Sequence, residues 1–252
     1  MRIIFAYLLF FVGMSAFSNR ASADQALPYD SGTDSLCFKN ADPELATVGI
    51  PILGKLGVEQ GVCQGIAGLT AAFLENAEFD HSRQSHYSPS EIHQIVRTLV
   101  DLHQSGVRHR FTISGYKNIK DFCEQNKVEM MRASILYNAK IAERDILPVA
   151  LELFNLKKNN LRGIEDQRKL QTELKSIEYT LTHGRYPLML YYKHVVMVTA
   201  FKEVVEASGD KSIFIDAYDS NHPDEIVTQA FSLENSGLPK VLNYMIWNLS
   251  SR

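Results

Sequence analysis

Three polar residues that lie far apart in the chain could together carry out nucleophilic catalysis. Cys63 follows Gly61-Val62 and opens an apolar run with the spacing of a helix. A thiol attacks only as its thiolate, which the partial positive charge and free N–H groups of a helix N-terminus favour. His194 begins a Val-rich strand and could serve as the base. Asp219 lies at the end of the next strand-like run and could orient the imidazole ring; Asn221 is a second candidate for this role.

The same residues also have ordinary structural explanations. Cysteine is among the residues most often buried, so Cys63 could be a core residue of an apolar helix. His194 could cap the edge of a strand, and the run Asp219-Ser-Asn221 is typical of an Asx turn. The catalytic interpretation therefore requires that the three side chains meet in the folded chain.

A helix over residues 62–77 would position Cys63. Its apolar residues recur three or four positions apart, which is the pattern of one buried helical face: Val62, Ile66, Leu69 and Phe73. Gly61, Gly65 and Gly68 lie close to Cys63 in the sequence. We expect these small residues to leave room for a substrate backbone to approach the sulfur.

The remaining elements predict a helical first part followed by an antiparallel sheet. Residues 24–60 are rich in Pro and Gly and predict an extended, turn-rich segment, and the polar residues 78–87 predict a loop. Ser88-Pro89-Ser90-Glu91 is a capping box that starts a helix ending at Gly106, and residues 117–182 are mostly helical. Strand-like runs then cover 187–192, 194–201, 212–218, 226–231 and 240–247. This order predicts an α+β fold.

The N-terminus indicates export. Residues 1–23 begin Met1-Arg2, continue through an apolar stretch and end Ala21-Ser22-Ala23, which is typical of a signal peptide cleaved before Asp24. A single N-terminal membrane anchor is the alternative, and no other stretch of the sequence could span a bilayer. We therefore expect a periplasmic or extracellular protein. The formal net charge of −3 argues against nucleic acid as a partner.

Three cysteines in an oxidising compartment leave an odd one. If Cys37 pairs with Cys123, Cys63 is the free thiol; parity alone suggests this bridge, and all three could equally be reduced. His81 and His86 are too loosely spaced, and too short of Cys partners, to predict a zinc site. We therefore expect no metal. The sequence also contains no nucleotide-binding glycine loop, so we expect no cofactor.

Gly61-Val-Cys63-Gln-Gly65, His194-Val-Val-Met-Val and Tyr218-Asp-Ser-Asn221-His-Pro223 together resemble the papain-like cysteine peptidases. Within that family the motifs look more like the bacterial bacteriocin-processing and type III effector branches than like papain itself. The resemblance implies a papain-like domain over 56–252 in which Cys63 is the nucleophile, His194 the general base and Asp219 the residue that orients it.

The resemblance also implies further features of a thiol hydrolase. Gln60, three residues before Cys63, would join the Cys63 N–H in the oxyanion hole. The loop-rich segment 24–55 could be a propeptide, and the substrate would be a peptide or protein. A transamidase or cell-wall peptide amidase could use the same triad, although the Asp-Cys-Ser start of the NlpC-type wall enzymes is absent. A catalytically silent papain-fold binding module is the alternative from another functional class.

Overall fold

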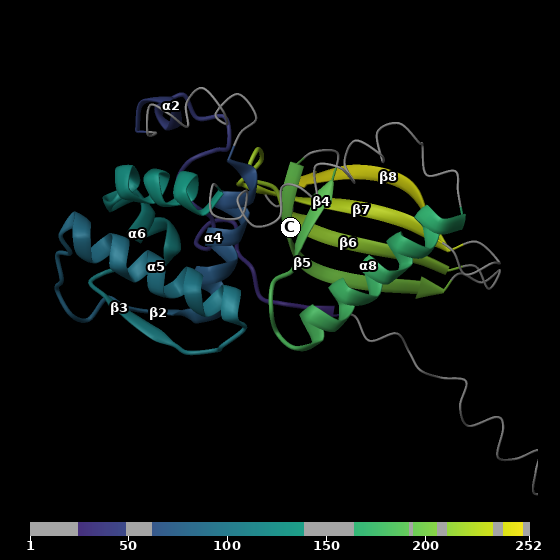
Figure 1. The fold of residues 1–252 in the computed structure, drawn as a ribbon, viewed down its shortest axis with the longest axis horizontal. Helices are drawn as coiled ribbons and strands as arrows, with labels where there is room; N and C mark the ends of the chain where they lie inside the picture. The colour runs from purple at the N-terminus through teal and green to yellow at the C-terminus, as the bar shows by residue number, and fades with distance from the viewer. Residues whose placement is uncertain are drawn as a thin grey trace, which may run out of the picture.

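The computed structural model describes residues 25–48, 62–138, 164–191, 194–205, 211–233 and 239–248. Helices dominate the first half and an antiparallel sheet the second, so the fold is α+β, as the sequence predicts. In Figure 1 the two halves lie side by side, with α4 between the other early helices and the sheet. The predicted signal peptide, Gln60 and Gly61 fall outside the described residues.

Short strands lie between the helices of the first half, and the second half consists of consecutive strands. The helices are α2 (Glu44–Val48), α4 (Cys63–Asn76), α5 (Pro89–Ser105), α6 (Ile119–Gln125), a helix over 127–138, and α8 (Ile164–Thr182). The strands are β1 (Gln25–Ala26), β2 (Ala77–Asp80), β3 (Phe111–Ser114), β4 (Leu188–Tyr191), β5 (His194–Val205), β6 (Lys211–Tyr218), β7 (Glu225–Leu233) and β8 (Pro239–Asn248).

The capping box predicted for α5 is present. The Ser88 side chain accepts a hydrogen bond from the Glu91 N–H, and the Glu91 carboxylate accepts one from the Ser88 N–H. Gly106 ends the helix with a φ of 71°, in the left-handed region that favours glycine. These local bonds satisfy N–H groups that a helix start leaves without intrahelical partners.

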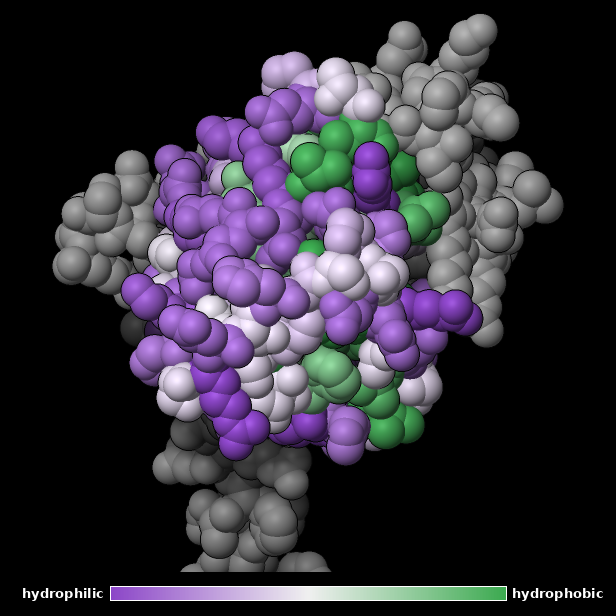
Figure 2. All heavy atoms as spheres, turned by 90° about the vertical axis from the view of Figure 1, so that its left-hand side faces the viewer, coloured by the Kyte–Doolittle hydropathy of each residue, from purple (hydrophilic) through white to green (hydrophobic). Residues whose placement is uncertain are grey.

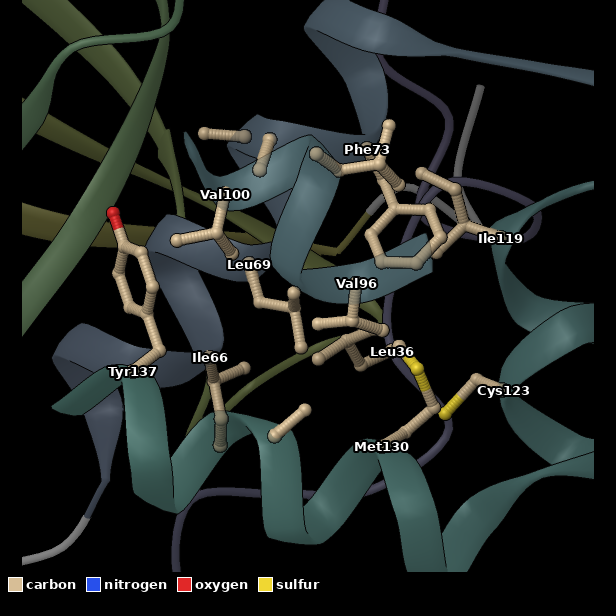
Figure 3. Close-up of a cluster of buried hydrophobic side chains, with 14 of the residues drawn as sticks. Leu36, Ile66, Leu69, Phe73, Val96, Val100, Ile119, Cys123, Met130 and Tyr137 are labelled. Atoms are coloured by element: carbon tan, nitrogen blue, oxygen red, sulfur yellow. The ribbon is translucent and has the colours of Figure 1, made fainter. Parts of the chain in front are cut away.

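The central helix α4 is buried on almost every side. Figure 3 shows its side chains between those of α5, such as Val96 and Val100, and those of the helix over 127–138, such as Met130 and Tyr137. These residues belong to one hydrophobic cluster that also includes Val195 and other residues of the sheet. Because α4 packs against both halves, its N-terminus is held firmly beside the first strands of the sheet.

Two glycines of α4 pack against the helix over 127–138. A Cβ atom on Gly65 would lie 1.9 Å from the Ser134 backbone oxygen, and one on Gly68 would lie 2.1 Å from the Tyr137 ring. The expectation that these two glycines leave room for a substrate is therefore wrong. They are glycines because two helix backbones approach each other closely at this point.

Residues 78–87 are not a continuous loop. The first of them belong to β2, which pairs in parallel with β3 in a small separate sheet, with Ala77 opposite Phe111 and Asp80 opposite Ser114. The polar sequence after Phe79 suggested a loop, but the strand needs only four residues, and of these only Ala77 is buried. Residues 25–48 likewise contain α2, which was not predicted in that turn-rich segment.

The main sheet has the strand order β1-β5-β6-β7-β8, and every pair in it is antiparallel. β4 also pairs with β5, so β5 is bordered by β6 on one edge and by β4 and then β1 on the other. The helix α8 crosses one face of this sheet (Figure 1). The apolar residues that it buries there with the strands are Leu174, Ile177, Leu181, Val198, Phe201, Ile213 and Ile215.

The described part of the N-terminal segment belongs to the core. β1 pairs with β5, and Leu36, Phe38 and Leu45 are buried. A disulfide joins Cys37 to Cys123 in α6, which is visible at the right of Figure 3. The propeptide interpretation of residues 24–55 stays a prediction; a cut after this segment would leave it attached through the disulfide.

The outer face of the helical half is largely polar. In Figure 2, hydrophilic residues cover most of this face and hydrophobic ones gather in separate patches. Within the described ranges, no helix has the length and apolar character needed to cross a membrane.

Candidate active site

Cys63 is the first residue of α4, and its thiol lies against the start of β5. The residue is 7% exposed, and its Sγ accepts a hydrogen bond from the Val195 N–H at 3.4 Å. The N-cap residue Val62 offers no side-chain cap. The partial positive charge of the helix start therefore acts on the sulfur without competition from the side chain of the N-cap residue.

His194 reaches the same place because the hairpin of β4 and β5 makes it the first residue of β5, opposite Tyr191. Asp219 directly follows the last residue of β6, Tyr218, which pairs with Met197 of β5. The distance from His194 Nε2 to Asp219 Oδ1 is 2.5 Å, and Asp219 is 3% exposed. Adjacent antiparallel strands thus bring the imidazole and the carboxylate together.

The Asx turn considered for Asp219 is also present. The Asn221 N–H donates to Asp219 Oδ1 at 2.8 Å, so the same oxygen serves the turn and contacts the histidine. The side-chain nitrogen of Asn221 lies 3.3 Å from His194 Nε2. The two candidates for the orienting role therefore both reach the ring, and the carboxylate of Asp219 is the closer.

The tautomer of His194 follows from its partner. An ionised carboxylate only accepts hydrogen bonds, so Nε2 carries a proton that it donates to Asp219. The His194 side chain also acts on the Cys63 thiol, whose pKa it lowers. Because Nε2 is engaged by Asp219, we infer that Nδ1 is the nitrogen facing the thiol.

The pKa values of the thiol and the imidazole move in opposite directions. Burial raises the pKa of Cys63, but the His194 side chain and the N–H groups of Val195 and Gln64 outweigh burial and lower it overall. Burial lowers the pKa of His194, but Asp219 and Cys63 outweigh it and raise that pKa to about 9. Both shifts favour the charged form of the pair, a thiolate beside an imidazolium.

Side chains from two other segments occupy N–H groups at the start of α4. Asn40 Oδ1 accepts a hydrogen bond from the Val62 N–H at 2.5 Å. Asn138 Oδ1 accepts one from the Gly65 N–H at 3.2 Å. These bonds fix the first turn of the helix from both sides, because the first N–H groups of a helix have no intrahelical acceptors.

The N–H groups nearest the sulfur have different partners. The Gln64 N–H helps to lower the pKa of the Cys63 thiol. Within the described part of the chain, the Cys63 N–H donates to no acceptor. This N–H is a candidate donor to an oxyanion, the role that the family resemblance gives it together with Gln60.

Cys37 and Cys123 form the disulfide, with their Cα atoms 5.6 Å apart, and Cys63 is the free thiol. His81 and His86 lie in the segment between β2 and α5. No group of three or more His, Cys, Asp or Glu side chains among the described residues could hold a metal ion.

Sequence reasoning missed Asn40 and the Val195 N–H. Asn40 lies in the turn-rich run Lys39-Asn40-Ala41-Asp42-Pro43, where a polar residue is expected and nothing distinguishes it. The Val195 N–H is a backbone group that every residue type except proline supplies. Only the folded arrangement reveals either contact.

Comparisons of the chain with protein-family models, curated proteins and solved structures find no match. The geometry of Cys63, His194 and Asp219 therefore carries the functional argument.

Proposed function

We propose that this protein is an exported papain-like thiol hydrolase that cleaves amide bonds in peptides or proteins. The observation that carries the proposal is that Cys63, His194 and Asp219 meet at one place: the N–H of Val195, the residue after His194, donates to Cys63 Sγ at 3.4 Å, and His194 Nε2 lies 2.5 Å from Asp219 Oδ1. Its three members play the parts that nucleophilic catalysis requires: a nucleophile, a base beside it, and an acceptor that orients the base.

The first half of the reaction would form an acyl-enzyme. The Cys63 thiolate attacks the carbonyl carbon of the amide, and the negative charge moves to the carbonyl oxygen, where the Cys63 N–H can donate to it. The proton on His194 Nδ1 passes to the amide nitrogen as the C–N bond breaks. The amine leaves, and the acyl group remains on Sγ as a thioester.

The second half would hydrolyse that thioester. His194, now neutral, takes a proton from water while the water oxygen attacks the acyl carbon. The C–S bond breaks, the acid leaves, and the thiolate and imidazolium are restored. Asp219 accepts a hydrogen bond from Nε2–H throughout, which keeps Nδ1 facing the reacting atoms.

Two further features support the family and the compartment within this proposal. The nucleophile begins a central helix, the base begins β5, and the orienting residue directly follows the neighbouring strand β6, which matches the layout that the sequence resemblance implies. The Cys37–Cys123 disulfide fits an oxidising compartment, as expected of an exported protein.

Cleavage of a diverse peptide mixture, read by mass spectrometry, tests the proposal. The mature chain from Asp24 should create new peptide termini, while Cys63→Ala and His194→Ala should create none above background. Lys39→Ala, which changes an exposed side chain, is the matched control and should cleave like the wild type. Cleavage that persists in Cys63→Ala would contradict the proposal.

The alternatives give different products in the same experiment. A transamidase shares the acyl-enzyme, so adding glycinamide would yield ligated peptides in place of free acids. A binding module would leave the mixture unchanged, and its Cys63 would not react with iodoacetamide near neutral pH.

A further inference from the structure

Asn40 joins the two parts of the chain that carry the proposed triad. Its Oδ1 accepts from the Val62 N–H at the start of α4, at 2.5 Å. Its Nδ2 donates to Asn221 Oδ1 at 3.1 Å, and its own N–H donates to the Ser220 carbonyl at 3.0 Å. One half-buried residue therefore holds the residue before the nucleophile against the two residues after Asp219.

These hydrogen bonds also determine which way two amide side chains point. The Val62 N–H can only donate, so the Asn40 atom facing it must be the oxygen. The Asn40 nitrogen then faces Asn221, whose facing atom must in turn be its oxygen. The Asn221 nitrogen is consequently the atom 3.3 Å from His194 Nε2.

This orientation matters for the histidine. With its nitrogen toward the ring, Asn221 cannot accept the proton of Nε2, and Asp219 Oδ1 is left as the acceptor. If the Asn221 amide rotated, its oxygen would compete for that proton. Asn40 thus acts on the ring through Asn221, and on the thiol through Val62.

The backbone around Asn40 is well anchored. Cys37, three residues earlier, is bonded to Cys123, which is fully buried, and Phe38 is also buried. On the other side, the Asp42 N–H donates to the Lys39 carbonyl and closes a turn around Asn40. An anchored backbone lets a short side chain define the distance between two distant elements.

We propose that Asn40 is a positioning residue that fixes the start of α4 relative to the loop 219–221 and orients Asn221 so that, of the two side chains, only Asp219 accepts the hydrogen bond from His194 Nε2–H. This inference rests on the proposed function of the Cys63–His194 pair. It assigns Asn40 no contact with substrate.

The test compares Asn40→Ala with the wild type and with Lys39→Ala, an adjacent exposed position. The measurement is the rate at which iodoacetamide alkylates Cys63 as a function of pH. We expect Asn40→Ala to alkylate roughly fivefold more slowly at pH 6.5, the effect of losing about one hydrogen bond, with the profile shifted toward that of an ordinary thiol. A profile equal to that of Lys39→Ala would overturn the inference.

Asn40→Asp keeps the test decisive if Asn40→Ala does not fold. The new carboxylate can still accept from the Val62 N–H, but it cannot donate to Asn221, so the Asn221 amide should rotate and turn its oxygen toward His194. We expect the NMR titration midpoint of His194 to rise, and the rise to shrink when Asn221→Ala is added. An unchanged midpoint would overturn the inference.

The failure of this inference differs from the failure of the proposed function. If alkylation of Cys63 depends on His194 but not on Asn40, the positioning role is wrong and the catalytic pair stands. If alkylation of the wild type is indifferent to His194→Ala, the catalytic pair itself is wrong.

Discussion

Gly65→Ala separates two explanations of the glycines in α4: access for a substrate, or close packing of helices. The new Cβ would lie 1.9 Å from the Ser134 backbone oxygen, whereas real Cβ contacts essentially never fall below 3.0 Å. The two helices must therefore move apart by about 1 Å, because a backbone oxygen cannot rotate away. The movement also loosens the bond between the Gly65 N–H and Asn138.

The cost follows from those two effects. Overpacking of this kind costs about 1–3 kcal/mol, and weakening one hydrogen bond adds about 1 kcal/mol. We expect the free energy of unfolding to fall by about 2–4 kcal/mol, which lowers Tm by roughly 5–15 °C in a chain of this size.

Urea denaturation followed by circular dichroism measures this change. Gly32→Ala is the matched control, since the nearest atom to its Cβ would be a flexible side-chain oxygen of Asp30 at 3.2 Å. We expect the control to unfold within about 0.5 kcal/mol of the wild type. Equal stability of Gly65→Ala and the control, together with blocked alkylation of Cys63, would refute the packing explanation and restore the access explanation.

Three other predictions concern pH, the core and a helix end. Peptide cleavage should fall above about pH 9, because His194 there loses the proton that the leaving amine needs. Alkylation of Cys63 needs no such proton and should not fall. A parallel decline of both rates would contradict the ion pair. Glu75→Leu should cost about 3–5 kcal/mol in urea unfolding, because His103 and the Tyr186 N–H lose a buried acceptor; a change below 1 kcal/mol would contradict this. Ser88→Ala should cost about 1 kcal/mol by the same measurement, and no loss would show that the capping box is not stabilising.

Local patterns predicted most of the elements that position the site. The spacing of Val62, Ile66, Leu69 and Phe73 predicted α4 because a buried helical face repeats every three to four residues. The capping box at Ser88 predicted the start of α5 because its bonds join residues three positions apart. The strand runs after Pro187 all correspond to strands, with bounds shifted by a few residues.

The candidate triad could be proposed from residue types and chain order. Cys63, His194 and Asp219 each stand at the end of a predicted element, where side chains of different elements can meet. Their distances could not be predicted, because these depend on how β5 and β6 pair and on how α4 packs against β5.

The sequence did not predict features that depend on residues far away in the chain. Gly65 looks the same whether a substrate or a helix 70 residues later approaches it, and only the position of Ser134 decides. The pairing of β2 with β3 joins four-residue strands across the whole of α5, so no local pattern marks it. Asn40 is one of several polar residues in a turn-rich segment, and its role comes from Val62 and Asn221.

The most direct test of the central claim is the pH dependence of iodoacetamide alkylation of Cys63, in the mature chain and in His194→Ala under the same reducing conditions. Cys63→Ala identifies any label at other sites. We predict a thiol that titrates well below the ordinary value of about 8.5, and that moves back toward it in His194→Ala. An unreactive thiol, or one whose titration is indifferent to His194, would contradict the account.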